Sequence, residues 1–225
     1  MNRKIKSFIL VLSIFFFSIV GSSSLFAELD PELAQTQNPR IDQTDFFLSG
    51  FLAVGPNKLT GHSELGVAST FGVEAGMFRY IGLYNVLHVG MEYSLMLTNY
   101  STSKYEDDLF VPVRLMPKIG YGLVFSKNVI TFLDVGIGPV ITKLKRKLDD
   151  SSNSATSDTT LGLAYTLGFN VNIQLHKAIS LNAGMRGDLI DVKPSEFQID
   201  EMDQINGDSI TTISYGMHAG LKFNL

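Results

Sequence analysis

Apolar and polar residues alternate strictly along residues 161–175. Odd-numbered positions carry leucine, tyrosine, phenylalanine, valine or isoleucine, and even-numbered positions carry glycine, alanine, threonine, asparagine or glutamine. A period of two is that of a β-strand whose faces meet different surroundings. A tilted strand of about 9–11 residues spans a bilayer, and a membrane barrel needs one aliphatic face toward lipid. The segment therefore predicts a transmembrane strand.

The same alternation recurs along most of the chain and predicts eight strands. Their spans are 45–55, 67–79, 84–97, 109–123, 129–142, 160–175, 179–190 and 210–225. Strands of globular proteins average about 5–6 residues, so these lengths favour a membrane barrel. The expected fold is all-β, an eight-stranded antiparallel transmembrane β-barrel with up-and-down meander topology.

The expected connections alternate in length. Long polar segments cover 55–66, 98–108, 143–158 and 191–209, whereas the connections between them are short. Bacterial outer-membrane barrels have short periplasmic turns and long extracellular loops. We therefore expect both termini of the barrel in the periplasm.

The N-terminus predicts export and sets the domain boundaries. A basic start (Arg3, Lys4 and Lys6) precedes an apolar run over 8–20 and small residues over 21–27, as in a secretory signal peptide. We expect a signal peptide over 1–27 with cleavage after Ala27, a polar periplasmic segment over 28–43 and the barrel domain over 44–225. An uncleaved membrane anchor stays open as an alternative.

Composition narrows the functional classes. The chain has no cysteine, which excludes an acylated lipoprotein N-terminus, thiolate metal sites and disulfides. Removing 1–27 takes away three of the 18 basic residues and none of the 22 acidic ones, which leaves a net charge of −7. That balance gives no general attraction to nucleic acid.

Strand parity assigns charged residues to the barrel interior. Four acids face four bases there, with His88 and His218 on the same side. The candidates are Glu74, Glu92, Asp134, Asp188, Arg114, Lys118, Arg186 and Lys222. Because an eight-stranded barrel encloses little space, buried charges must be paired. The favoured interpretation is a structural ion-pair plug, and the alternative is a narrow gate for ions or small polar solutes.

The C-terminus carries a second signal. His218, Gly220, Phe223 and Leu225 fit the spacing of the segment that the barrel-assembly machinery reads at the end of a last strand. Together with the eight-strand pattern, residues 44–225 resemble the small OmpA/OmpX/OmpW-like (porin-like) outer-membrane barrels. This resemblance implies an outer-membrane location in a Gram-negative-type cell envelope, a monomer and contact with the assembly machinery.

Three lysines mark the loop-side end of the fifth predicted strand. If the strand keeps its register, Lys143, Lys145 and Lys147 point outward, at the height of lipid or lipopolysaccharide phosphates. A solvated basic loop and an extracellular anionic ligand such as a glycosaminoglycan stay open as alternatives.

Enzymatic chemistry has little support in the sequence. His62, Ser63 and Glu64 are adjacent, but neighbouring side chains on a strand or loop rarely meet as nucleophile and base. Lipid A deacylases of this barrel type use a His-x-Ser spacing, which the chain lacks. The acidic segment over 191–208 does not follow a calcium-loop template. We expect no enzyme activity, no metal and no cofactor.

Three functions follow from these observations. The favoured one is a structural or surface-interaction barrel that binds partners through its long loops. The second is a narrow gated porin-like channel. The third is a periplasmic lipocalin-like ligand binder, whose aliphatic side chains would face inward.

Overall fold

The computed structural model describes residues 42–59, 65–81, 84–102, 105–147, 154–156, 160–192 and 210–225, and the side chains of residues 59, 99–110, 143–160 and 210 lie outside that description. The predicted signal peptide therefore lies outside the described residues, as does all but the end of the polar segment. The strands are β1 (Thr44–Leu59), β2 (Gly66–Ile81), β3 (Asn85–Thr102), β4 (Tyr105–Ser126), β5 (Val129–Lys147), β6 (Ser154–Thr156), β7 (Thr160–His176), β8 (Ile179–Val192) and β9 (Ile210–Asn224).

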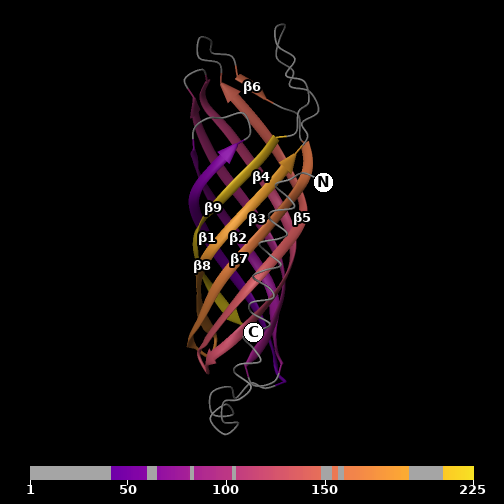
Figure 1. The fold of residues 1–225 in the computed structure, drawn as a ribbon, viewed down its shortest axis with the longest axis vertical. Helices are drawn as coiled ribbons and strands as arrows, with labels where there is room; N and C mark the ends of the chain where they lie inside the picture. Colours follow the sequence, from indigo (N-terminus) through magenta and orange to yellow (C-terminus); the bar gives the residue numbers. More distant parts are fainter. Residues whose placement is uncertain are drawn as a thin grey trace.

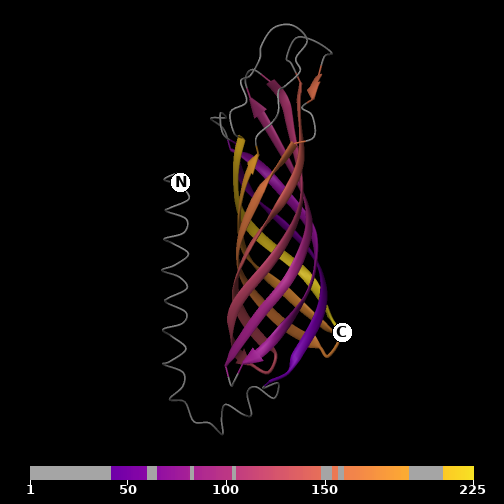
Figure 2. The ribbon, with the colours of Figure 1, turned by 90° about the vertical axis from the view of Figure 1, so that its right-hand side faces the viewer.

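Eight of these strands close into a barrel. Each long strand pairs antiparallel with its neighbours in the chain, β9 pairs back onto β1, and β4 also pairs with β5. Figures 1 and 2 show an elongated cylinder from two sides, with strands that slant around its axis. The predicted eight-stranded meander is confirmed.

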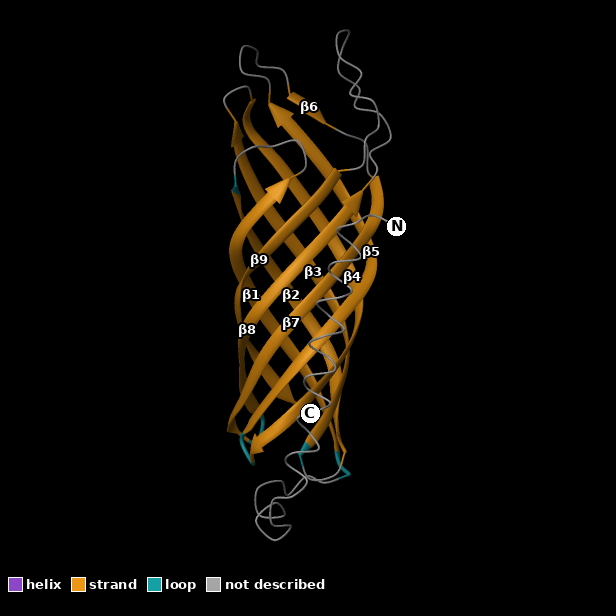
Figure 3. Ribbon diagram, in the orientation of Figure 1, coloured by secondary structure: helices purple, strands orange, loops and turns teal. Residues whose placement is uncertain are grey.

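The strands are longer than predicted at one end of the barrel. We call this the loop end; Figure 3 shows the turns in teal at the opposite, turn end. β3 continues to Thr102 and β4 begins at Tyr105, so most of the expected loop over 98–108 is paired strand. β6 pairs with β5 beyond the start of β7 and was not predicted. These segments lack the alternation of a membrane strand, which explains why the sequence pattern ended too early.

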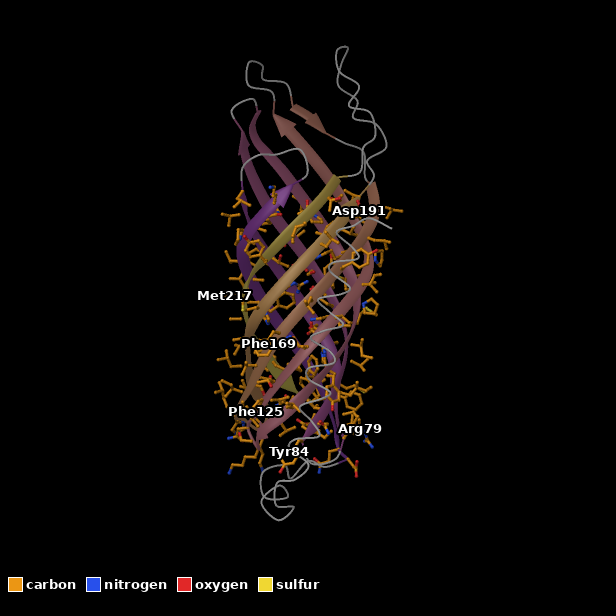
Figure 4. The ribbon with its side chains drawn as sticks, in the orientation of Figure 1. Arg79, Tyr84, Phe125, Phe169, Asp191 and Met217 are labelled. Atoms are coloured by element: carbon orange, nitrogen blue, oxygen red, sulfur yellow. The ribbon has the colours of Figure 1, made fainter. Side chains whose placement is uncertain are left out.

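The outer face of the barrel is apolar over most of its height. Exposed side chains from five of the strands include Phe71, Tyr93, Ile119, Phe169 and Met217. Arg79 and Asp191 lie toward opposite ends of the barrel, whereas Met217 and Phe169 lie between them (Figure 4). This arrangement matches a lipid-facing belt. It rules out the lipocalin-like alternative, which requires a polar exterior.

Two clusters of buried apolar side chains fill the barrel on either side of its middle. The loop-side cluster contains Ala68, Met96, Met116, Val140, Ala164, Ile190 and Val192. The turn-side cluster contains Phe47, Phe78, Tyr80, Val86, Val124, Ile130 and Phe132. Among the described residues, no helix has the length and apolar character needed to cross a membrane.

Candidate functional site in the barrel lumen

The eight charged residues assigned to the interior all lie inside the barrel and are buried. They come from six strands, because alternate positions of every strand point to the same enclosed space. Glu74 lies on β2, Glu92 on β3, Arg114 and Lys118 on β4, Asp134 on β5, Arg186 and Asp188 on β8, and Lys222 on β9. All of them except Lys222 are joined in one network, which we call the charged layer.

Arg186 is the centre of one half of the charged layer. Its Nη1 and Nη2 each donate to Glu92 at 2.8 Å, and its Nε donates to Asp188 at 2.9 Å. Arg114 Nη1 lies 2.8 Å from Asp188, and its Nε donates to Ser94 at 3.1 Å. The planar guanidinium of Arg186 therefore holds two carboxylates in one bidentate arrangement.

Lys118 is the centre of the other half. Its Nζ lies 3.2 Å from Glu74, 3.0 Å from Asp134 and 3.5 Å from Glu92. Since Glu92 also contacts Arg186, the two halves form one continuous network. The network satisfies charges that would each cost several kcal/mol to bury alone.

Two further polar residues, neither of them predicted to belong to the network, extend the half around Lys118. His88 Nε2 lies 2.7 Å from Glu74 Oε1, and Asn170 Nδ2 donates to Asp134 at 3.0 Å. Both have the inward parity of their strands, so the signal was present. Strand parity predicts which residues face inward, but it does not predict which of them form hydrogen bonds or ion pairs with one another.

Lys222 differs from the other lumen cations. Among the described residues, no carboxylate lies within 4.0 Å of its Nζ. The Nζ lies instead 4.0 Å from the ring centres of both Phe47 and Phe78 and 5.4 Å from that of Phe132. The expected ion pair of Lys222 is therefore replaced by aromatic contacts. The balance of four acids and four bases could not reveal this, because it ignores the height of each charge in the barrel.

The charged layer lies between the two apolar clusters. On β3, Met96 follows Glu92 toward the loop end, and on β8, Ile190 follows Asp188. On β2, Phe78 follows Glu74 toward the turn end. The layer itself contains a cavity of about 20 Å³, lined in part by Lys118, Asp134 and His218. Such a cavity has room for about one water molecule.

The remaining candidate residues are those predicted for lipid contact, barrel assembly and catalysis. Lys143, Lys145 and Lys147 belong to β5, but their side chains lie outside the described part. Phe223 and Leu225 are exposed at the turn end, whereas His218 is buried in the lumen. His62, Ser63 and Glu64 also lie outside the described residues. Within the described ranges, no group of three acidic or histidine side chains is arranged to hold a metal ion.

Comparison with known proteins gives a likeness of fold. No family model and no curated protein matches the chain. The solved structure of the outer membrane enzyme PagL has a TM-score of 0.50 and 14% identity, covering 76% of this chain and 97% of that one. Neisserial surface protein A has a TM-score of 0.43 and 16% identity, covering 79% and 96%. OprG from Pseudomonas aeruginosa has a TM-score of 0.43 and 13% identity, covering 81% and 95%.

The fold and the outer face together identify the class of protein. The barrel is closed and eight-stranded, its exterior is apolar, and its fold is shared with an outer-membrane protein. A closed barrel leaves no unpaired strand edge in the hydrocarbon core, as a membrane requires. The chain is an integral outer-membrane β-barrel.

Proposed function

We propose that this protein is a closed, monomeric outer-membrane barrel that acts at the cell surface through the segments at its loop end. In this proposal the lumen is a structural plug and the protein is not an enzyme. The observation that carries the proposal is the position of the charged layer between two buried apolar clusters.

An ion that crosses the lumen needs a continuous polar path. The side chains of Met96, Met116 and Val140 have no exposed surface on the loop side, and Val86 has none on the turn side. Moving a charge past such groups without water carries a large desolvation cost. The cavity of about 20 Å³ is too small to relieve that cost.

Planar-bilayer conductance of the purified, refolded protein tests this proposal. A gel that separates folded from heat-unfolded protein first establishes that the barrel has formed. We expect no discrete conductance for the wild-type protein or for Arg186→Ala, because both apolar clusters persist in the variant. Conductance events in the wild-type protein that change in Arg186→Ala would contradict a closed lumen.

A narrow gated channel is the second candidate, and one observation favours it. Arg114 Nη2 is buried and has no hydrogen-bond partner among the described residues. An arginine with a free donor can exchange partners without losing every contact, which a gate requires. The same bilayer experiment decides between the two candidates.

The proposed absence of enzyme activity has its own test, because the fold is shared with an outer membrane enzyme. Purified protein in lipopolysaccharide-containing vesicles is incubated, and lipid A is analysed by mass spectrometry. We expect unchanged acylation of lipid A. A mass loss that disappears in Ser63→Ala would overturn this part of the proposal.

A further inference from the structure

At the turn end of the lumen, the ammonium group of Lys222 lies among the rings of three phenylalanines. Lys222 is 1% exposed, as deeply buried as Arg114 of the charged layer. Its Nζ lies within about 6 Å of three phenylalanine ring centres, the range in which a cation is attracted to the face of a ring. We call Phe47, Phe78 and Phe132 the aromatic box.

The aromatic box is itself a packed unit. The ring centres of Phe47 and Phe78 are 5.1 Å apart, and those of Phe78 and Phe132 are 5.3 Å apart. The His88 ring stacks against Phe47 with an interplanar angle of 20°. Because His88 also bonds to Glu74, the box is tied to the charged layer. Contact with His88, which is bonded to the charged layer, thus helps to hold the rings in place.

The strands that supply these groups give the contact a particular meaning. The rings come from β1, β2 and β5, and the ammonium group comes from β9, whose pairing with β1 closes the barrel. In the closed register Lys222 lies opposite Ser49 of β1 and Ser180 of β8. The site is therefore complete only when the last strand is paired on both sides.

The contact also distinguishes between registers of β9. A slip by one residue would turn Lys222 toward lipid, and a slip by two would move it by roughly 7 Å along the strand, out of the aromatic box. We propose that the aromatic box is an ammonium site in which Lys222 locks the closing strand in register. This inference is independent of whether the lumen conducts.

A double-mutant cycle tests the lock. Lys222→Met removes the charge and shortens the side chain by one heavy atom, and Phe78→Leu keeps an apolar side chain and removes the ring. Urea unfolding in phospholipid vesicles is followed by the folded band on gels, since the chain has no tryptophan. We expect a coupling of about 2- to 30-fold in the unfolding equilibrium constant between the two substitutions.

Phe51→Leu gives the matched control. Phe51 lies on β1 and faces the lumen, but its ring lies beside Arg186 and His218 rather than Lys222. The effects of Phe51→Leu and Lys222→Met should therefore add. A coupling with Phe78→Leu no larger than that with Phe51→Leu would overturn the lock.

A second measurement tests the proposal if Lys222→Met refolds too poorly for a urea unfolding curve. Lys222→Ala leaves space for the missing three methylenes and the ammonium group. We expect propylammonium present during refolding to raise the yield of folded Lys222→Ala, and propanol at the same concentration to have no such effect. Equal yields with the two compounds, or no gain with either, would overturn the proposal.

Discussion

Arg186 holds two carboxylates at once, so its removal should be costly. Arg186→Met leaves Glu92 with only the 3.5 Å contact to Lys118 and leaves Asp188 with Arg114. Leaving a buried charge uncompensated costs about 3–5 kcal/mol. We expect a loss of stability in that range, measured by urea unfolding in vesicles.

The double variant Arg186→Met with Glu92→Gln is the informative control. It removes both a cation and an anion, so Lys118 keeps Glu74 and Asp134, and Arg114 keeps Asp188. We expect it to be more stable than Arg186→Met alone. An equal or greater loss in the double variant would show that packing, rather than charge balance, sets the cost.

Phe169 tests the outer face of the same barrel. It is 46% exposed and lies on the outer flank between Arg79 and Asp191 (Figure 4). An arginine on the lipid face costs about 2–4 kcal/mol near the bilayer midplane. We expect Phe169→Arg to lower the free energy of unfolding in vesicles by that amount and Phe169→Leu to leave it nearly unchanged. Equal folding yields for the two variants would place this position outside the hydrocarbon core.

At the scale of the strand, the lysines at the end of β5 are a test of lipid contact. We expect the triple variant of Lys143, Lys145 and Lys147 to glutamine to lose affinity for anionic lipid by about 1 kcal/mol per lysine. The measurement compares folding into phosphatidylglycerol-containing vesicles with folding into purely zwitterionic ones. An equal loss of folding in both vesicle types would show that the three lysines stabilise β5 itself and do not act through anionic lipid.

The strands also show which parts of the fold and of the lumen site can be predicted from the sequence alone. Alternation predicted the eight strands wherever lipid lies on one side and the lumen on the other, because each face then selects a different residue class. It failed over 98–108, where β3 and β4 remain paired although no alternation marks their faces. It failed again for Lys222, since parity gives the face of a residue but neither its height nor its neighbours. Pairing geometry and layer height come from the closed barrel as a whole.

At the scale of the molecule, the loop end and the barrel should be separable. β8 and β9 are paired up to Val192 and Ile210, so their register does not depend on the segment between them. Replacing 193–209 with Asn-Gly, a sequence that favours a tight hairpin turn, should therefore leave the heat-modifiable barrel intact. We expect its urea midpoint to stay close to that of the wild-type protein.

The proposed surface role gives the same replacement a second outcome. If partners bind at the loop end, the shortened protein should lose binding to cell-surface ligands while it keeps its fold, its apolar belt and its closed lumen. Because 193–209 carries five acidic residues and one lysine, binding is measured with labelled polylysine as a cationic probe, beside a variant with the reversed sequence over 193–209, which keeps length and charge. Loss of folding in the shortened protein would mean that residues 193–209 help to close the barrel. The loop end and the barrel would then fold as one cooperative unit.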